Sequence, residues 1–155
     1  MTKLLLSLHV LASVLAVGPV TVAASMFPGA LRHAHAEPGD GEALTNLRTL
    51  HRICRVYTVI GIAVPVFGFA TASSLGVLGS AWLITSIVLT AAAAAVLALL
   101  ILPAQDRALA TARTPGSGPG PRSAGRLAMH TGVFNLLWAT VTVLMIIRPG
   151  STTGA

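Results

Sequence analysis

The stretch from His51 to Gly79 is the feature that most constrains how this chain can fold. It reads HRICRVYTVIGIAVPVFGFATASSLGVLG, and it carries no charged side chain from Val56 to Leu78. A helix of ~20 apolar residues crosses the hydrocarbon core of a bilayer, because each residue advances the helix by ~1.5 Å. The stretch therefore predicts a membrane-spanning helix.

The composition places most of the chain out of contact with water. Its 155 residues are 54% hydrophobic and 9% charged, whereas soluble domains carry roughly 25% charged residues. The formal net charge is +6, but no basic run or basic–aromatic cluster predicts a nucleic-acid surface. Cys54 is the only cysteine, which excludes an internal disulfide and a cysteine-based zinc site. We therefore expect a protein of the lipid bilayer with no nucleic-acid partner.

Four apolar segments predict an all-α, integral membrane four-helix bundle that forms a single membrane domain over residues 1–155. The expected spans are about 4–27, 56–78, 81–102 and 127–147, with cytoplasmic loops at 28–55 and 103–126. Within the first loop, Glu42 to His51 is expected to form a short amphipathic lead-in to the second span. The second and third spans are separated by residues 73–80 alone, and so short a link predicts an antiparallel hairpin.

The first apolar segment also has features of a cleavable signal peptide. Lys3 precedes it, and Ala34-His35-Ala36 follows it in a pattern that signal peptidases accept. Its apolar run from Leu4 to Phe27 is, however, longer than the usual ~7–15 residues of a signal peptide. We expect this segment to remain as the first span.

The basic residues predict the orientation of the spans. Eight of the ten Lys and Arg residues lie in 28–55 and 103–126, and only Lys3 and Arg148 lie on the other side. Because cytoplasmic loops are enriched in basic residues, both long loops are expected in the cytoplasm. This gives a multi-pass protein of the bacterial inner membrane with both termini outside.

Small side chains follow one face of the second and third spans. The positions predicted for close helix packing are Gly61, Pro65, Gly68, Ser86, Thr90 and Ala94, joined by Asn135 in the fourth span. In lipid, small residues allow helix backbones to approach closely. The face of the second span also includes His51, Cys54, Thr58 and Ala72, and Pro65 is expected to kink this helix. These faces predict association with a second copy or with another membrane protein.

Three histidines in or beside the spans are candidate haem b ligands. They are His9, His51 and His130, and neutral imidazole is a common metal ligand. The alternative for His9 is a hydrogen bond to a neighbouring helix, and Asn135 is likewise expected to reach another helix. His51 and His130 are expected near the same membrane surface, where the alternative is two interfacial histidines.

Other chemical motifs are weak in this sequence. His33 and His35 form an H-x-H pattern beside Glu37, which by itself is a poor indication of a transition-metal site, and we assign no metal there. No Ser-His-Asp set, carboxylate pair or glycine-rich phosphate loop is present, so we assign no catalytic residue and do not expect an enzyme.

The chain resembles the uncharacterised bacterial four-helix predicted integral membrane proteins. The resemblance is carried by LLLSLHVLASVLAVGP, by HRICRVYTVIGIAVPVFGFATA and by a last helix that ends in MIIRPG. More distantly, Leu8-His9, Gly18 and Arg32-His33 resemble the HemJ-type protoporphyrinogen oxidases, and the layout resembles the copper-resistance CopD membrane domain. The oxidase resemblance implies a haem-linked role for His9. Those oxidases also use a lysine in the third helix, and residues 81–102 contain none.

Taken together, the sequence predicts a non-enzymatic structural or interaction subunit of the membrane. The alternative is a b-type haem redox protein related to porphyrin metabolism that uses His9. A weaker alternative is a small transporter or copper-handling subunit.

Overall fold

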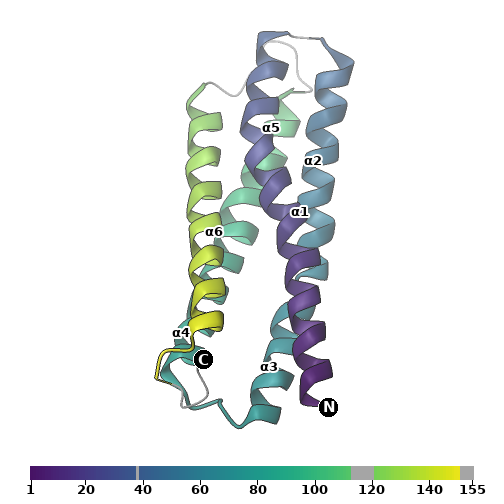
Figure 1. The fold of residues 1–155 in the computed structure, drawn as a ribbon. Helices are drawn as coiled ribbons and strands as arrows, with labels where there is room; N and C mark the ends of the chain where they lie inside the picture. The colour runs from purple at the N-terminus through teal and green to yellow at the C-terminus, as the bar shows by residue number, and fades with distance from the viewer. Residues whose placement is uncertain (38, 113–120, 151–155) are drawn as a thin grey trace.

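The computed structural model describes residues 1–37, 39–112 and 121–150, and all regular secondary structure in these residues is helical. The elements in chain order are α1 (Thr2–Ala36), α2 (Gly41–Ile60), α3 (Ala63–Leu75), α4 (Ala81–Ala95), the π-helical segment η1 (Val96–Ile101), α5 (Leu102–Ala112) and α6 (Pro121–Ile147). Figure 1 shows them as long rods that run side by side. The expected all-α class is confirmed.

Four helical stretches of the described residues are long and apolar enough to cross a membrane. They are Thr2–Ala36, Gly41–Leu75, Ala81–Ala112 and Arg122–Ile147. This confirms the expected membrane helical bundle. With 35 residues, α1 is ~52 Å long at ~1.5 Å per residue, whereas the hydrocarbon core is ~30 Å thick. α1 is therefore longer than the hydrocarbon core is thick.

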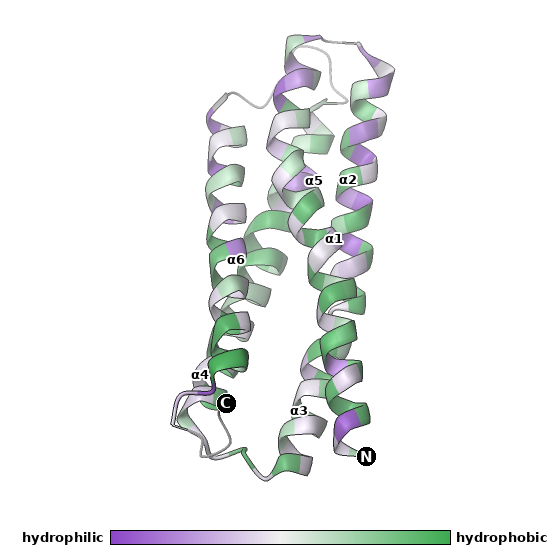
Figure 2. Ribbon diagram, viewed as in Figure 1, coloured by the Kyte–Doolittle hydropathy of each residue, from purple (hydrophilic) through white to green (hydrophobic). Residues whose placement is uncertain are grey.

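Most of the described part of the expected loops, 28–55 and 103–126, is helical, and the lead-in helix expected from Glu42 to His51 lies within α2. α1 continues through Pro28 to Ala36, and α2 begins at Gly41, where the Asp40 carboxylate caps it by accepting the N–H of Glu42 at 2.8 Å. Residues 113–120 lie outside the described residues. Figure 2 shows hydrophilic residues gathered at the end of the bundle that carries the α1–α2 connection. The hydrophilic residues thus indicate the expected boundary of the membrane span, whereas the helix itself continues past that boundary.

The third span was expected to run from about Ala81 to Leu102 and to end at Pro103, and the helix itself continues past this proline into α5. A proline in a helix lacks an N–H and crowds the carbonyl four residues earlier, here that of Leu99. Residues Val96–Ile101 adopt the wider π-helical turn directly before this proline. A π-turn shifts the hydrogen-bond spacing from four residues to five, which allows the chain to remain helical past the proline.

The second span is interrupted one turn before Pro65, where a kink was expected. α2 ends at Ile60 and α3 begins at Ala63. At this break the carbonyl of Gly61 accepts the N–H of Val64 at 3.1 Å. Bonds of this three-residue spacing satisfy backbone groups that would otherwise be unpaired in lipid.

A short link joins α3 to α4, but the two helices do not pack against each other along their length. Gly76 ends α3 with a φ of 68°, a left-handed conformation that favours glycine. Beyond the link, α3 packs mainly against α1, and α4 packs mainly against α6 (Figure 1). The expected antiparallel hairpin is therefore open: α3 and α4 are joined by a short link but belong to two different arms of the bundle. One arm is α1 with α3, and the other is α4 with α6.

The main core lies at the end of the bundle where α1, α2, α5 and α6 meet. Its most deeply buried large side chains are Phe27, Leu31, Leu47, Ile101, Leu127 and Phe134. A second, small cluster of Ala72, Trp82 and Leu83 lies beside the α3–α4 link. The end of the bundle with the α1–α2 connection is therefore held by a large apolar core, and the end with the α3–α4 link by a much smaller one.

Close contact between α1 and α3 depends on Gly68. The ring nitrogen Nδ1 of His9 lies 2.9 Å from the carbonyl oxygen of Val64, to which it donates a hydrogen bond. A Cβ atom at Gly68 would lie 2.8 Å from Cε1 and 3.0 Å from Nδ1 of the same ring. The absence of a side chain at Gly68 therefore creates the space that the His9 ring occupies.

We predict that Gly68→Ala displaces the His9 ring and lowers the free energy of unfolding by about 1–3 kcal/mol, the usual cost of overpacking. Unfolding in mixed detergent micelles measures this change. Gly132→Ala is the matched control, because a Cβ at Gly132 meets nothing within 4 Å. Equal stability of the two variants would contradict this account of the α1–α3 contact.

Candidate functional site

A cavity of about 290 Å³ lies between the two arms, and all four spanning segments contribute to its wall. This volume is at the small end of the ~300–1,000 Å³ range of ligand pockets. Its wall contains no charged residue, and most of its side chains are aliphatic or aromatic. Several wall residues, such as Val59, Ile62 and Ala94, are exposed, so the cavity is an apolar space that opens to the surface of the bundle.

Small side chains from two different helices form opposite parts of this wall. Thr58, Gly61 and Pro65 contribute from the second spanning segment, and a second set, Thr90, Ala94 and Ala98, contributes from the third. Except for Ala98, which follows Ala94 at the same four-residue spacing, the members of both sets belong to the small-residue faces found in the sequence. They do not close against each other, and the space between them is the cavity.

Both helix irregularities border the same cavity. Gly61 and Ile62, at the break between α2 and α3, line it on one side. Leu97 and Ala98, within the π-helical segment, line it on the other. Interruptions of this kind in helices frequently occur at functional sites. The cavity thus lies where two helices depart from regular geometry.

None of the three candidate haem ligands lines the cavity. His9 is held between α1 and α3 by Val64 and Gly68, as described above. His51 is buried at the other end of the bundle, and Nδ1 of His130 is buried without a hydrogen-bond partner. No hydrogen bond or ion pair joins His51 to His130 in the described part of the chain.

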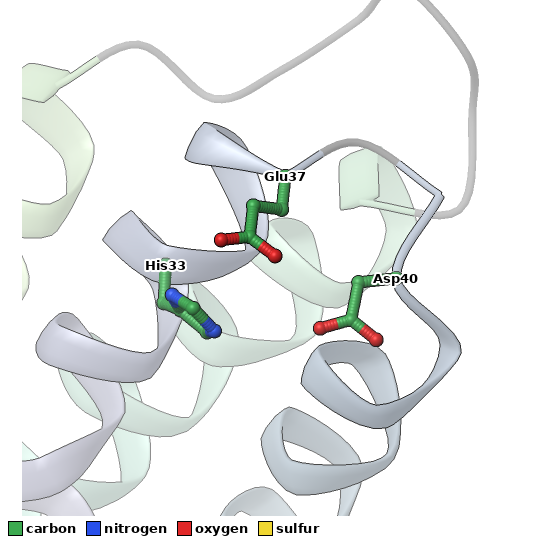
Figure 3. A group of neighbouring side chains, drawn as sticks. All are labelled: His33, Glu37 and Asp40. Atoms are coloured by element: carbon green, nitrogen blue, oxygen red, sulfur yellow. The ribbon is translucent and has the colours of Figure 1, made fainter.

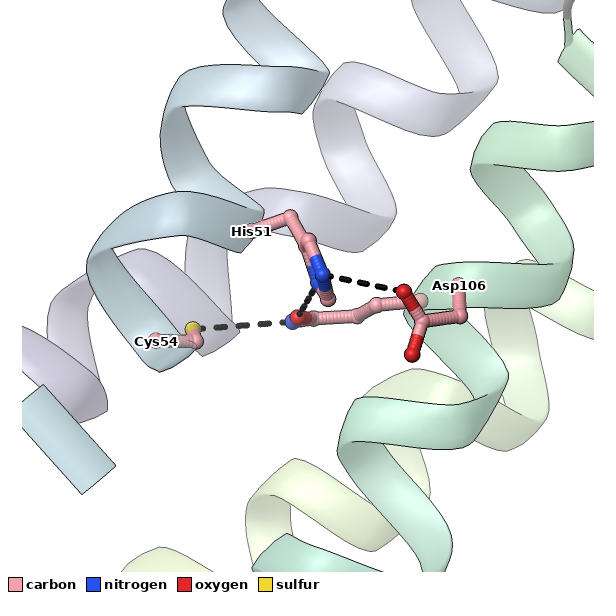
Figure 4. A network of polar contacts seen from close by, with 4 residues as sticks. His51, Cys54 and Asp106 are labelled. Carbon is pink, nitrogen blue, oxygen red and sulfur yellow. Dashed lines mark hydrogen bonds and ion pairs between the residues drawn. The ribbon is translucent and has the colours of Figure 1, made fainter. Parts of the chain in front are cut away.

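His51 belongs to a polar network that connects α2 to α5 (Figure 4). Its Nδ1 lies 3.0 Å from Oε1 of Gln105, and its Nε2 lies 3.0 Å from Oδ1 of Asp106. Nε2 of Gln105 in turn donates to Sγ of Cys54 at 3.6 Å. Because both ring nitrogens of His51 face acceptor oxygens, both contacts are satisfied as hydrogen bonds when the ring carries two protons.

This network holds two helices together and does not form a nucleophile–base pair. Cys54 is fully buried, and it contacts the amide of Gln105, with no hydrogen bond to His51. Gln105 is also fully buried, so its amide depends on these two partners. The sequence analysis did not single out Gln105 or Asp106, because both lie in the segment expected to be a loop.

Polar side chains of α6 connect this helix to α1. Nδ2 of Asn135 donates to Oγ of Ser25 at 3.2 Å, and the hydroxyl of Thr131 points to the carbonyl of Ala24 at 3.5 Å. One turn further on, Trp138 lines the cavity with its ring edge-on to Phe134. Trp138 was missed as a site residue, although its i, i+4 spacing from Phe134 indicates that the two rings share a face.

We predict that Gln105→Leu lowers the free energy of unfolding by about 1–3 kcal/mol, because it leaves a buried ring nitrogen of His51 without its partner. Arg107→Gln is the control on the same helix, since Arg107 is exposed, and its effect should stay within ~0.5 kcal/mol. Thermal unfolding of the two variants in detergent measures the difference. If Gln105→Leu were as stable as the control, the network would not hold α2 to α5.

The comparisons with known proteins agree with this architecture. No curated protein and no solved structure matches the chain. A family model described as predicted integral membrane protein, DUF2269, matches residues 3–149. Because this match spans nearly the whole sequence and the four membrane helices, the chain belongs to this family of predicted integral membrane proteins.

Proposed function

We propose that this protein is a binding subunit of the bacterial inner membrane that holds an apolar chain of the lipid class between its two arms. The observation that carries the proposal is the cavity of about 290 Å³ between two walls of small residues. When such a space is empty, the atoms on its walls lose packing contacts. An acyl or isoprenoid chain from the surrounding bilayer supplies those contacts.

The chemistry of the wall supports a hydrocarbon occupant. No charged side chain lines the cavity, so nothing there compensates a charged ligand group. The hydroxyl of Thr58 donates to the carbonyl of Cys54 at 2.6 Å and is already occupied within its own helix. Trp138 also lines the wall, and its Nε1 is buried without a hydrogen-bond partner in the described residues. Recognition of a hydrocarbon occupant rests on shape and on contact with side chains such as Phe134 and Trp138.

The arginine distribution supports the orientation of the bundle. We place the end with the α1–α2 connection in the cytoplasm and both termini outside, because eight of the ten basic residues lie at 28–55 and 103–126. In this orientation the cavity residues lie near the middle of the first and fourth expected spans and in the cytoplasmic half of the second and third. The occupant is then reached from within the bilayer and not from water.

The haem alternative has less support from the geometry. It requires a histidine beside the space that would hold the porphyrin, and His9, His51 and His130 are all absent from the cavity wall. His9 uses Nδ1 and one ring face to contact α3. We therefore carry over no chemistry from the HemJ-type and CopD membrane proteins to this chain.

A second role, self-association, is favoured by the exposed alanines of α4. Ala91 and Ala95 lie on the outward face of this helix, away from the cavity and from the buried residue Ala93. Small residues on a lipid-facing surface allow a second helix to approach closely. We include a homo-oligomer formed through this face as part of the proposed interaction function.

We predict that filling the cavity removes the bound chain. Ala92 and Ala94 are both exposed residues of α4, and of these two only Ala94 lines the cavity. Ala94→Phe therefore places a ring in the cavity, whereas Ala92→Phe places the same ring outside it. Native mass spectrometry of protein purified in mild detergent should show a lipid-class adduct on the wild type and on Ala92→Phe. The adduct should be lost or strongly reduced in Ala94→Phe.

The helical content of both variants, measured by circular dichroism, shows whether they fold. If Ala94→Phe does not fold, Thr90→Leu fills the same cavity with a smaller change. Equal adducts on filled and control variants, or none on the wild type, would contradict the proposal.

We predict that Ala95→Leu weakens self-association by holding the two α4 helices apart, while Ala92→Leu has a smaller effect. Crosslinking of the protein in proteoliposomes, over a range of protein-to-lipid ratios, measures the dimer fraction. A monomeric wild type at all ratios, or unchanged dimers in Ala95→Leu, would show that this face does not associate.

A further inference from the structure

Three metal-ligating side chains meet at the corner between α1 and α2 (Figure 3). His33 lies in the last turn of α1, Glu37 is the residue that ends α1, and Asp40 is the residue that precedes α2. The ligand atoms of the three side chains all lie within 4.8 Å of one another. This corner lies at the hydrophilic end of the bundle, far along α1 from the residues that line the cavity (Figure 2).

From this arrangement we infer that the corner is a binding site for a divalent first-row transition-metal ion, of which Zn²⁺ is the probe. The donor set is one imidazole nitrogen and two carboxylates, which suits Zn²⁺ and its neighbours better than Ca²⁺ or Mg²⁺, because these two prefer oxygen ligands alone. An ion that lies ~2.0–2.2 Å from each donor brings the donors closer together than they are now. Small rotations of the side chains achieve this, since His33 and Glu37 are exposed.

The backbone of this corner holds the three ligands in place. The N–H of Glu37 donates to the carbonyl of His33, and the N–H of Asp40 donates to the carbonyl of Glu37, both at 3.2 Å. The carboxylate of Asp40 is further oriented by the N–H of Glu42 at 2.8 Å, which leaves its other oxygen free. Each ligand residue is thus hydrogen-bonded to the next or to the start of α2.

The local charge gives an independent reason to expect a cation. The whole chain has four acidic residues and ten Lys and Arg residues, yet Glu37 and Asp40 lie together. In the described part of the chain neither carboxylate forms an ion pair, and the pair between His51 and Asp106 lies elsewhere. Two carboxylates at this separation repel each other. A divalent cation between them attracts both and so offsets their repulsion.

His35 provides a built-in control for this site. It is two residues from His33 and forms the H-x-H pattern with it, but its Nδ1 bonds to the carbonyl of Leu31 and it is not part of the cluster. Residues two apart point to different sides of a helix, whereas His33 and Glu37, four apart, share a side. The bound ion would therefore connect the end of α1 to the start of α2 and leave a coordination position open to water or to an external ligand.

The test is a calorimetric titration of Zn²⁺ into the full chain in detergent, stripped of metal and with any histidine tag removed. We expect one ion per chain in the wild type and the same affinity in His35→Ala. His33→Ala should bind at least ~10-fold more weakly, because it loses a direct ligand.

If His33→Ala does not fold, Glu37→Gln replaces it, because this substitution keeps the shape of the side chain. The same weakening of Zn²⁺ binding is expected. The inference is overturned by the absence of saturable binding in the wild type, or by wild-type affinity in His33→Ala or Glu37→Gln. An equal loss in His35→Ala would assign the ion to the H-x-H pair and would also overturn it.

Discussion

The structure depends on one constraint: a bilayer offers no water to the polar groups of the backbone. The four spanning segments are therefore helical throughout their apolar parts, and their interruptions remain hydrogen-bonded. At Gly61 the bonds change to three-residue spacing, and over Val96–Ile101 they take the wider π-helical spacing. Both changes accompany a proline that follows in the sequence. Both irregular segments border the same cavity. The two prolines, far apart in the sequence, therefore both affect the backbone around the candidate site.

Small residues act in two opposite ways in this bundle, according to what stands opposite them. At Gly68 the partner is the large ring of His9, and the two fit closely. Gly61 and Ala94 come from different spanning segments and line the same cavity, and both are small. Helices interdigitate when large residues face small ones. A small face opposite a small face leaves room instead, and this room is what makes a bound hydrocarbon chain the simplest account of the cavity.

The sequence was sufficient to predict the class, the order of the spans and the position of the kink. It did not predict where the helices end, because the polar residues of 28–36 are as compatible with a helix outside lipid as with a loop. The contact between His51 and Gln105 joins residues 54 positions apart, and no local pattern reports such a pairing. The grouping of His33 with Glu37 was available from their helical spacing. The adjacent H-x-H pattern drew attention to His35 instead, which points to another side of α1.

The most direct test of the central claim is a structure of the protein determined in a lipidic phase. The account predicts that the wall with Thr58 and Pro65 stays apart from the wall with Thr90 and Ala98, with elongated density of a hydrocarbon chain between them. Direct contact between these walls, with no space for a chain, would contradict it. In that case the small-residue faces would serve to close the bundle, and the protein would have no intramembrane binding site at this position.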